Sequence, residues 1–151
     1  MKENTAFETI LKHNQLALTL ISRIRKGIEI GTDRKRIAAY TLHFYSHFLR
    51  EQFLREEAMY MCLSESNILR IKACSEHALL SPLFERMHHV EFSLSDLQKL
   101  ATILERHIRF EKEKVFPHVE SLNYTPHRNT AATYKDSWSD PFWATPEAFE
   151  V

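Results

Sequence analysis

Glycine and proline are scarce in this chain, and their scarcity argues against a fold built from sheets and turns. Among 151 residues there are two glycines and five prolines. Both glycines lie in the first part of the chain, residues 1–124, where the only prolines are Pro82 and Pro117. Because glycine and proline interrupt helices and mark turns, so few of them favour long helices. The expected fold class is therefore all-α.

Three other absences exclude classes of function. Cys62 and Cys74 form no CxxC pair and have no zinc-binding spacing, so we expect reduced thiols in a cytoplasmic protein. No apolar run approaches the ~18 residues of a membrane span, and we expect neither a signal peptide nor a membrane partner. Basic and acidic residues number 20 each, and this zero net charge argues against a nucleic-acid partner.

Apolar residues at helical spacing predict four helices within residues 1–123. The "GTD" stretch at 31–33 and the polar "SESN" turn at 64–67 separate the first three, and "SLSD" at 93–96 begins the last. Short connections between amphipathic helices are typical of an antiparallel, up-down-up-down four-helix bundle. The predicted helices run from about Thr5 to Ile28, Arg34 to Leu63, Ile68 to His89 and Ser93 to Pro117.

Residues 124–151 differ from the rest and form a predicted second segment. This tail contains three of the five prolines together with several aromatic residues. We expect an irregular tail that packs across the bundle, because so many aromatic side chains are unfavourable in water. A disordered or partner-binding tail is the alternative.

Histidine is the residue in excess, with nine in the chain. His47 and Glu51 lie four residues apart in the second predicted helix, and His107 and Glu111 have the same spacing in the fourth. Residues four apart share one face of a helix, and both pairs fall on the apolar side as we read it. Charged groups normally avoid the apolar side of a helix unless something there needs them.

The other two predicted helices each place one histidine on their inner side. His13 lies between Ile10 and Ala17, and His77 lies in "CSEHALL". In an antiparallel bundle these histidines and the two His/Glu pairs are predicted to meet at one level. Imidazole and carboxylate groups suit a pair of divalent metal ions, with iron foremost. The predicted ligands are His13, His47, Glu51, His77, His107 and Glu111.

Three segments resemble the hemerythrin-like, or HHE cation-binding, domain family: "HFLRE", "SEHALL" and "ERHIRFEKEKVFP". The resemblance covers about residues 5–122 and implies a di-iron site inside a four-helix bundle. It implies that His13 and His47 hold one iron ion and that His77 and His107 hold the other. Glu51 and Glu111 would bridge the two ions together with an oxo or hydroxo group.

One departure from the family bears on function. Oxygen-carrying hemerythrins have a second histidine on the third helix, whereas Ala73 and Ser81 stand four residues before and after His77. The resemblance therefore implies a metal protein that binds dioxygen, nitric oxide or peroxide for sensing, scavenging or stress protection. The alternatives are a helical module whose metal is structural or regulatory, and a di-iron oxidase or peroxidase.

Several polar residues near the predicted ligands are given other roles. His43, one turn before His47, is an alternative ligand or a hydrogen-bonding neighbour. Glu56 and Glu57 are expected to face solvent or to end the helix. Cys74, one turn before His77, is expected to be a small packing residue.

Overall fold

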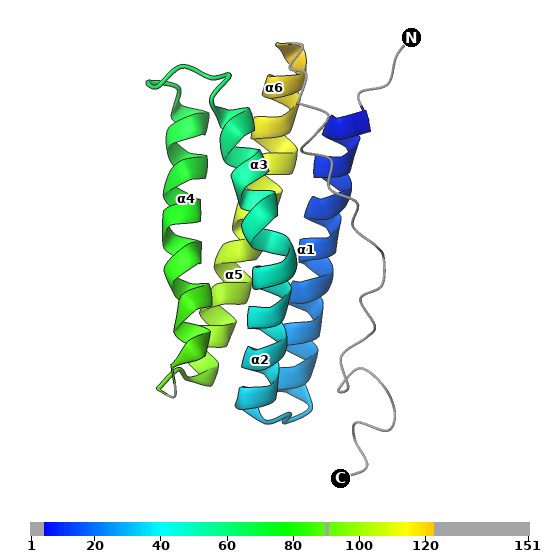
Figure 1. Cartoon of the computed structure of the whole chain (residues 1–151), viewed down its shortest axis with the longest axis vertical. Coiled ribbons are helices and arrows are strands. Elements are labelled where there is room, and N and C mark those ends of the chain that lie inside the picture. Colours follow the sequence, from blue (N-terminus) through cyan, green and yellow to red (C-terminus); the bar gives the residue numbers. More distant parts are fainter. Residues whose placement is uncertain (1–4, 90, 123–151) are drawn as a thin grey trace.

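The computed structural model describes residues 5–89 and 91–122, and these residues form helices joined by short links. The predicted tail, 124–151, lies outside the described residues. The helices lie side by side in Figure 1, with the α1–α2 turn and the α4–α5 link at the lower end and the α3–α4 link at the upper end. Within the described part, no helix is long and apolar enough to cross a membrane. The chain is therefore all-α over the part that can be described.

The helical segments combine into four rods. Rod 1 is α1 alone, and rods 2 and 4 each contain a single π turn within an otherwise α-helical rod. Rod 3 is α4 followed by a short 3₁₀ turn. The bounds are α1 Thr5–Glu29; α2 Arg34–Phe44, η1 Tyr45–Leu49 and α3 Arg50–Tyr60; α4 Ile68–Glu85 and η2 Arg86–His88; and α5 Leu94–Phe110, η3 Glu111–Val115 and α6 Phe116–Ser121.

The rods begin where the sequence places helix-start signals. Asp33 caps α2 by accepting a hydrogen bond from the Lys35 amide, after Gly31 has turned the chain with a φ of 80°. The Asn67 side chain caps α4. Ser93 and Asp96 form a reciprocal capping box at the start of α5. These caps satisfy amide groups that would otherwise lack partners, and they set where each rod starts.

Pro82 does not end the third rod. The sequence predicts a kink or a break at this residue, and α4 instead continues through it to Glu85 before the 3₁₀ turn begins. Pro82 is exposed, so its ring lies on the outside of the rod.

The core is divided into two apolar clusters. α1 packs against α2 and α5, and α4 packs against α5. In every rod, buried polar residues lie between the positions that supply one apolar cluster and those that supply the other. The larger cluster takes residues from the lower part of all four rods; the smaller one, which we call the upper cluster, contains Ile10, Met59, Tyr60, Leu63, Ala73, Val115, Phe116 and Val119.

Candidate metal centre

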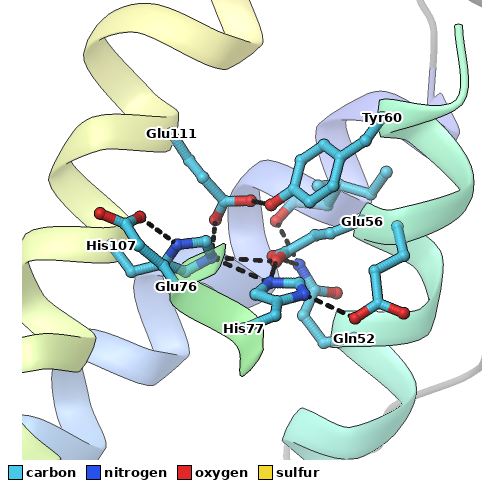
Figure 2. A network of polar contacts seen from close by, with 9 residues as sticks. Gln52, Glu56, Tyr60, Glu76, His77, His107 and Glu111 are labelled. Atoms are coloured by element: carbon cyan, nitrogen blue, oxygen red, sulfur yellow. Dashed lines mark hydrogen bonds and ion pairs between the residues drawn. The ribbon is translucent and has the colours of Figure 1, made fainter. Parts of the chain in front are cut away.

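Four buried side chains from three rods meet in the layer between the apolar clusters (Figure 2). We call them the His–Glu cluster: Glu56 of α3, His77 of α4, His107 of α5 and Glu111 at the start of η3. Each is at most 3% exposed. One nitrogen or oxygen atom from each lies within 4.8 Å of the corresponding atom of every other member. This convergence brings together the types of side chain that bind metal ions.

The distances inside the cluster match those between ligands of one metal ion. The Nε2 atoms of His77 and His107 are 2.9 Å apart, and Glu56 Oε1 lies 3.0 Å from the first and 3.6 Å from the second. Glu111 Oε1 lies 3.3 Å from His107 Nε2. A metal ion bonded at ~2.0–2.2 Å holds neighbouring ligand atoms about 3.0–3.5 Å apart. These four separations are therefore compatible with one shared ion.

Each imidazole of the cluster is oriented by a carboxylate on its far side. His77 Nδ1 lies 2.8 Å from a Glu57 carboxylate oxygen, and His107 Nδ1 lies 2.7 Å from one of Glu76. Each carboxylate accepts a hydrogen bond from an Nδ1–H group, and this leaves the Nε2 lone pair directed into the cluster. Such carboxylate–histidine pairs accompany histidine ligands in metal sites and increase their basicity.

Each carboxylate of the cluster is likewise fixed by a hydrogen bond to one of its two oxygens. The Gln52 side-chain amide donates a hydrogen bond of 2.8 Å to Glu56 Oε2, and the Tyr60 hydroxyl donates one to Glu111 Oε2 (Figure 2). The other Glu111 oxygen, Oε1, accepts no hydrogen bond from the described residues although it is buried. A buried carboxylate oxygen without a donor is unfavourable, and a cation would satisfy it.

The pKa shifts show that the cluster attracts positive charge. Burial and the neighbouring charge of Glu56 raise the pKa of Glu111 to about 7. Burial also opposes ionisation of Glu56, but hydrogen bonds from His107 and His77 outweigh it and hold the Glu56 pKa below its ordinary value. Burial disfavours a charged His107, yet the Glu111 carboxylate raises its pKa well above normal. Two carboxylates in one buried space therefore favour protons or a metal ion.

Three of the predicted ligands, His77, His107 and Glu111, belong to the cluster. His13 is buried beside it but is not a member, and its Nδ1 lies 3.3 Å from Gln52 Oε1. The same nitrogen lies 3.4 Å from Arg55 Nη1. Gln52 therefore connects His13 to the cluster, because its amide nitrogen is bonded to Glu56.

His47 and Glu51, the other two predicted ligands, lie on the exposed side of rod 2. His47 Nδ1 is bonded to the His43 carbonyl in the preceding turn, and His43 is exposed as well. Glu51 has a side chain that is 55% exposed and accepts a 2.5 Å hydrogen bond from Arg55. The structure therefore does not bring this pair to the cluster.

The π turn η1 explains why Glu51 faces outward. The Arg50 amide donates to the Tyr45 carbonyl, five residues back, so this turn contains one residue more than an α-turn. In an uninterrupted α-helix at about 100° per residue, Glu51 would continue the inner face of Phe44 and Phe48. With the extra residue, each following residue takes the angular position that the residue before it would have had. Gln52 then occupies the inner position in place of Glu51.

The expectation that Glu56 faces solvent is wrong, because its side chain is fully buried in the cluster. Glu57 is half-exposed, as expected for this pair, but it also binds His77. A signal for Glu56 is present in the sequence, where "HFLRE" at 47–51 is followed at once by "QFLRE" at 52–56. Both copies end in a glutamate, and the second one faces the core.

The donor set narrows the choice of metal ion. Two imidazole nitrogens and two carboxylate oxygens suit iron, manganese or zinc, whereas the thiols that soft metal ions prefer are exposed at Cys62 and Cys74. Comparison of the chain with protein-family models, with curated proteins and with solved structures finds no match. Function therefore has to be inferred from the chemistry of the cluster.

Proposed function

We propose that this protein is a hemerythrin-like metal protein in which the His–Glu cluster holds non-haem iron. The iron centre binds dioxygen, nitric oxide or peroxide, and the protein acts in sensing, scavenging or protection against stress. Glu56, His77, His107 and Glu111 are the proposed ligands. Three of them are the residues to which the resemblance assigns that role, and Glu56 takes the place expected for Glu51.

The observation that carries the proposal is the way in which each ligand is held. Every member of the His–Glu cluster has one polar atom fixed by an outer partner, which leaves a second atom directed inward. Histidines and carboxylates with a structural role need not direct their remaining polar atoms at one point, whereas metal ligands must. The outer partners are Gln52 for Glu56, Tyr60 for Glu111, Glu57 for His77 and Glu76 for His107.

Iron suits this donor set and leaves room for a further ligand. Ferrous iron accepts five or six ligands, so four protein ligands would leave open positions. Iron bound there would supply reversible binding of a small ligand and a change of oxidation state. The protein would supply orientation of the ligands and exclusion of water, since the cluster is buried between two apolar layers.

A cavity lies between the rod that contains His13 and the rod that contains His107 and Glu111. It has a volume of about 280 Å³. Among its lining residues, Asn14 and Lys112 directly follow His13 and Glu111 in the chain. Its size and its mainly apolar lining suit diatomic molecules better than large polar substrates.

The arrangement of the rods supports the up-down-up-down topology that the resemblance implies. The links between successive rods lie at alternate ends of the bundle in Figure 1. The His–Glu cluster sits at one level of three rods, and His13 of the fourth lies beside it. In four-helix bundles, metal sites are built in this way from inward side chains of facing helices.

A structural metal ion is a second candidate, favoured by the number of ligands. Four protein ligands and full burial are typical of closed zinc sites, which stabilise a fold and bind nothing further. The protein would then be a helical regulatory or interaction module. The two functions differ in whether the bound metal ion can accept an external ligand.

The proposal is tested by loading the full chain with ferrous ion under anaerobic conditions and adding nitric oxide. Bound iron and a new absorption band on addition of nitric oxide are expected. His107→Ala should abolish both, while His47→Ala, its matched exposed control, should leave both intact. A chain that binds no iron refutes the proposal, and iron that binds without any response to nitric oxide supports the structural role instead.

A further inference from the structure

We infer that the His–Glu cluster holds one metal ion per chain and that Gln52 and Arg55 keep a second ion out. This inference rests on the proposed function and differs from the pair of ions that the resemblance implies. It concerns the space next to the cluster, where His13 lies with Gln52 and Arg55. Three features of this space argue for a single ion.

The first feature is that neither carboxylate is free to bridge two ions. A bridging carboxylate uses one oxygen for each ion. Glu56 Oε2 accepts the Gln52 amide, and Glu111 Oε2 accepts the Tyr60 hydroxyl. Each carboxylate thus presents one oxygen, Oε1, and both Oε1 atoms face the same ion.

The second feature is that the side chain beside His13 is an amide, because Gln52 Oε1 lies 3.3 Å from His13 Nδ1. The Gln52 amide nitrogen donates to Glu56 and also to the Ile10 carbonyl, at 3.2 Å, so the orientation of this side chain is fixed by two bonds. The position of Gln52, four residues before Glu56, is the one that a histidine would need, as His107 has relative to Glu111. An amide group is a much weaker ligand than an imidazole.

The third feature is a buried positive charge. The Arg55 side chain is 4% exposed, and its guanidinium group lies 3.4 Å from His13 Nδ1 while it binds Glu51 at 2.5 Å. One divalent ion balances the two carboxylates of the cluster, and Glu51 balances Arg55. A second divalent ion beside His13 would lie close to this buried guanidinium, and the repulsion between the two positive groups would be strongly unfavourable.

Metal stoichiometry tests the inference without any measurement of activity. The full chain is loaded anaerobically with ferrous ion and, separately, with Mn²⁺, freed of excess metal, and analysed for metal and protein. We expect one ion per chain and a Mn²⁺ paramagnetic resonance spectrum of isolated ions. Two ions per chain with a spin-coupled spectrum would overturn the inference but leave the proposed function standing. A chain that binds neither ion would overturn the proposed function itself.

A double variant tests the role given to Gln52 and Arg55. Gln52→His with Arg55→Leu places a second imidazole next to His13 and removes the buried charge. We expect the folded variant, checked by its helical circular dichroism, to bind two ions per chain. Arg50→Leu is the matched control: it removes the arginine at the same place in the first copy of the repeat, where the side chain is 51% exposed, and should leave one ion. A folded double variant that still binds a single ion would contradict the role of these two residues.

Discussion

Rods 2 and 4 carry the same His-x-x-x-Glu spacing and use it in opposite ways. In rod 4, His107 and Glu111 are both buried and belong to the His–Glu cluster. In rod 2, His47 and Glu51 are both exposed, and the inner face instead carries Gln52 and Glu56. Each rod contains one π turn, but the turns are placed differently relative to the pairs.

The position of the π turn accounts for the different orientation of the two glutamates. In rod 4 the turn begins at Glu111, so regular α-helix connects it to His107. In rod 2 the turn spans Tyr45–Leu49 and therefore contains His47. Spacing determines whether two residues share a face, but a residue added to one turn changes which face that is. π turns of this kind are frequent at functional sites, and η3 contains Glu111 of the cluster.

The sharpest test of the comparison replaces the two histidines in turn. His107→Ala should reduce metal affinity by more than about 100-fold, because the loss of a ligand exceeds the 10–100-fold typical for the loss of an outer partner. His47→Ala should leave affinity unchanged, because its side chain is exposed. Calorimetric titration with Fe²⁺ or Mn²⁺ measures both. Equal losses in the two variants would mean that the pairs are equivalent after all.

The outer partners of the carboxylates should matter less than the ligands but more than the surface. Tyr60→Phe removes the donor to Glu111, and Gln52→Met removes the donor to Glu56, with little change of volume. Each should weaken metal binding by about 10–100-fold. Tyr45→Phe, which alters a buried tyrosine in the larger apolar cluster, is the control and should retain full affinity. An unchanged affinity in both test variants would show that the ligands need no orienting partner.

Deletion of Ser46 should have a smaller effect, even though it shortens a rod. Ser46 is exposed and lies within η1, so its loss should convert the π turn into an α-turn and keep Glu56 on the inner face. Metal binding is therefore expected to survive. Deletion of the exposed Ala58, in the regular helix α3, should instead turn Met59 and Tyr60 away from the core and lower stability and binding. Loss of metal on deletion of Ser46 would show that the π turn itself is required.

The smallest effects, on stability alone, are expected at the N-terminal caps of rods 2 and 4. Ser93→Ala breaks the capping box of α5 and should cost about 1 kcal/mol of stability. Asp33→Ala at the start of α2 should cost less, since one hydrogen bond is lost instead of a reciprocal pair. Urea unfolding of the two variants measures the difference.

The capping box also makes a prediction about pH. The hydrogen bond from the Ser93 amide holds the pKa of Asp96 below its ordinary value. Its contribution is therefore present above the unfolded-state pKa of about 3.9 and is lost as the pH falls through the lower folded-state pKa. The stability difference between wild type and Asp96→Asn should shrink over that range. A difference that does not change with pH would assign the effect to the side-chain shape instead of its charge.

The all-α class and the rod boundaries could be predicted because local signals determine them. The Ser93 start and the break at Gly31–Asp33 depend on residues next to each other in the chain, and the structure confirms both. The inner face of rod 4 could be predicted for the same reason, since α5 has a strongly one-sided apolar pattern up to Glu111.

The inner face of rod 2 could not be predicted, because its phase depends on a turn that leaves no local signal. Leu54 and Met61 are large and apolar, yet they are 61% and 66% exposed, so residue type does not mark the inner face here. The repeated "FLRE" offered two glutamates, and only the packing of the finished bundle selects the second. The role of Gln52 could not be predicted for another reason. No characteristic sequence spacing marks an amide side chain that orients a metal ligand.

The polar layer between the two apolar clusters should also separate two regions that open locally at different free energies. The upper cluster is small, so its amides should exchange with solvent through local opening at a lower free energy than those around the larger cluster. An ion bonded to Glu56, His77 and His107 would link three rods at the boundary between them. Metal binding would then slow amide exchange around Met59 and Val115, although neither residue is a proposed ligand.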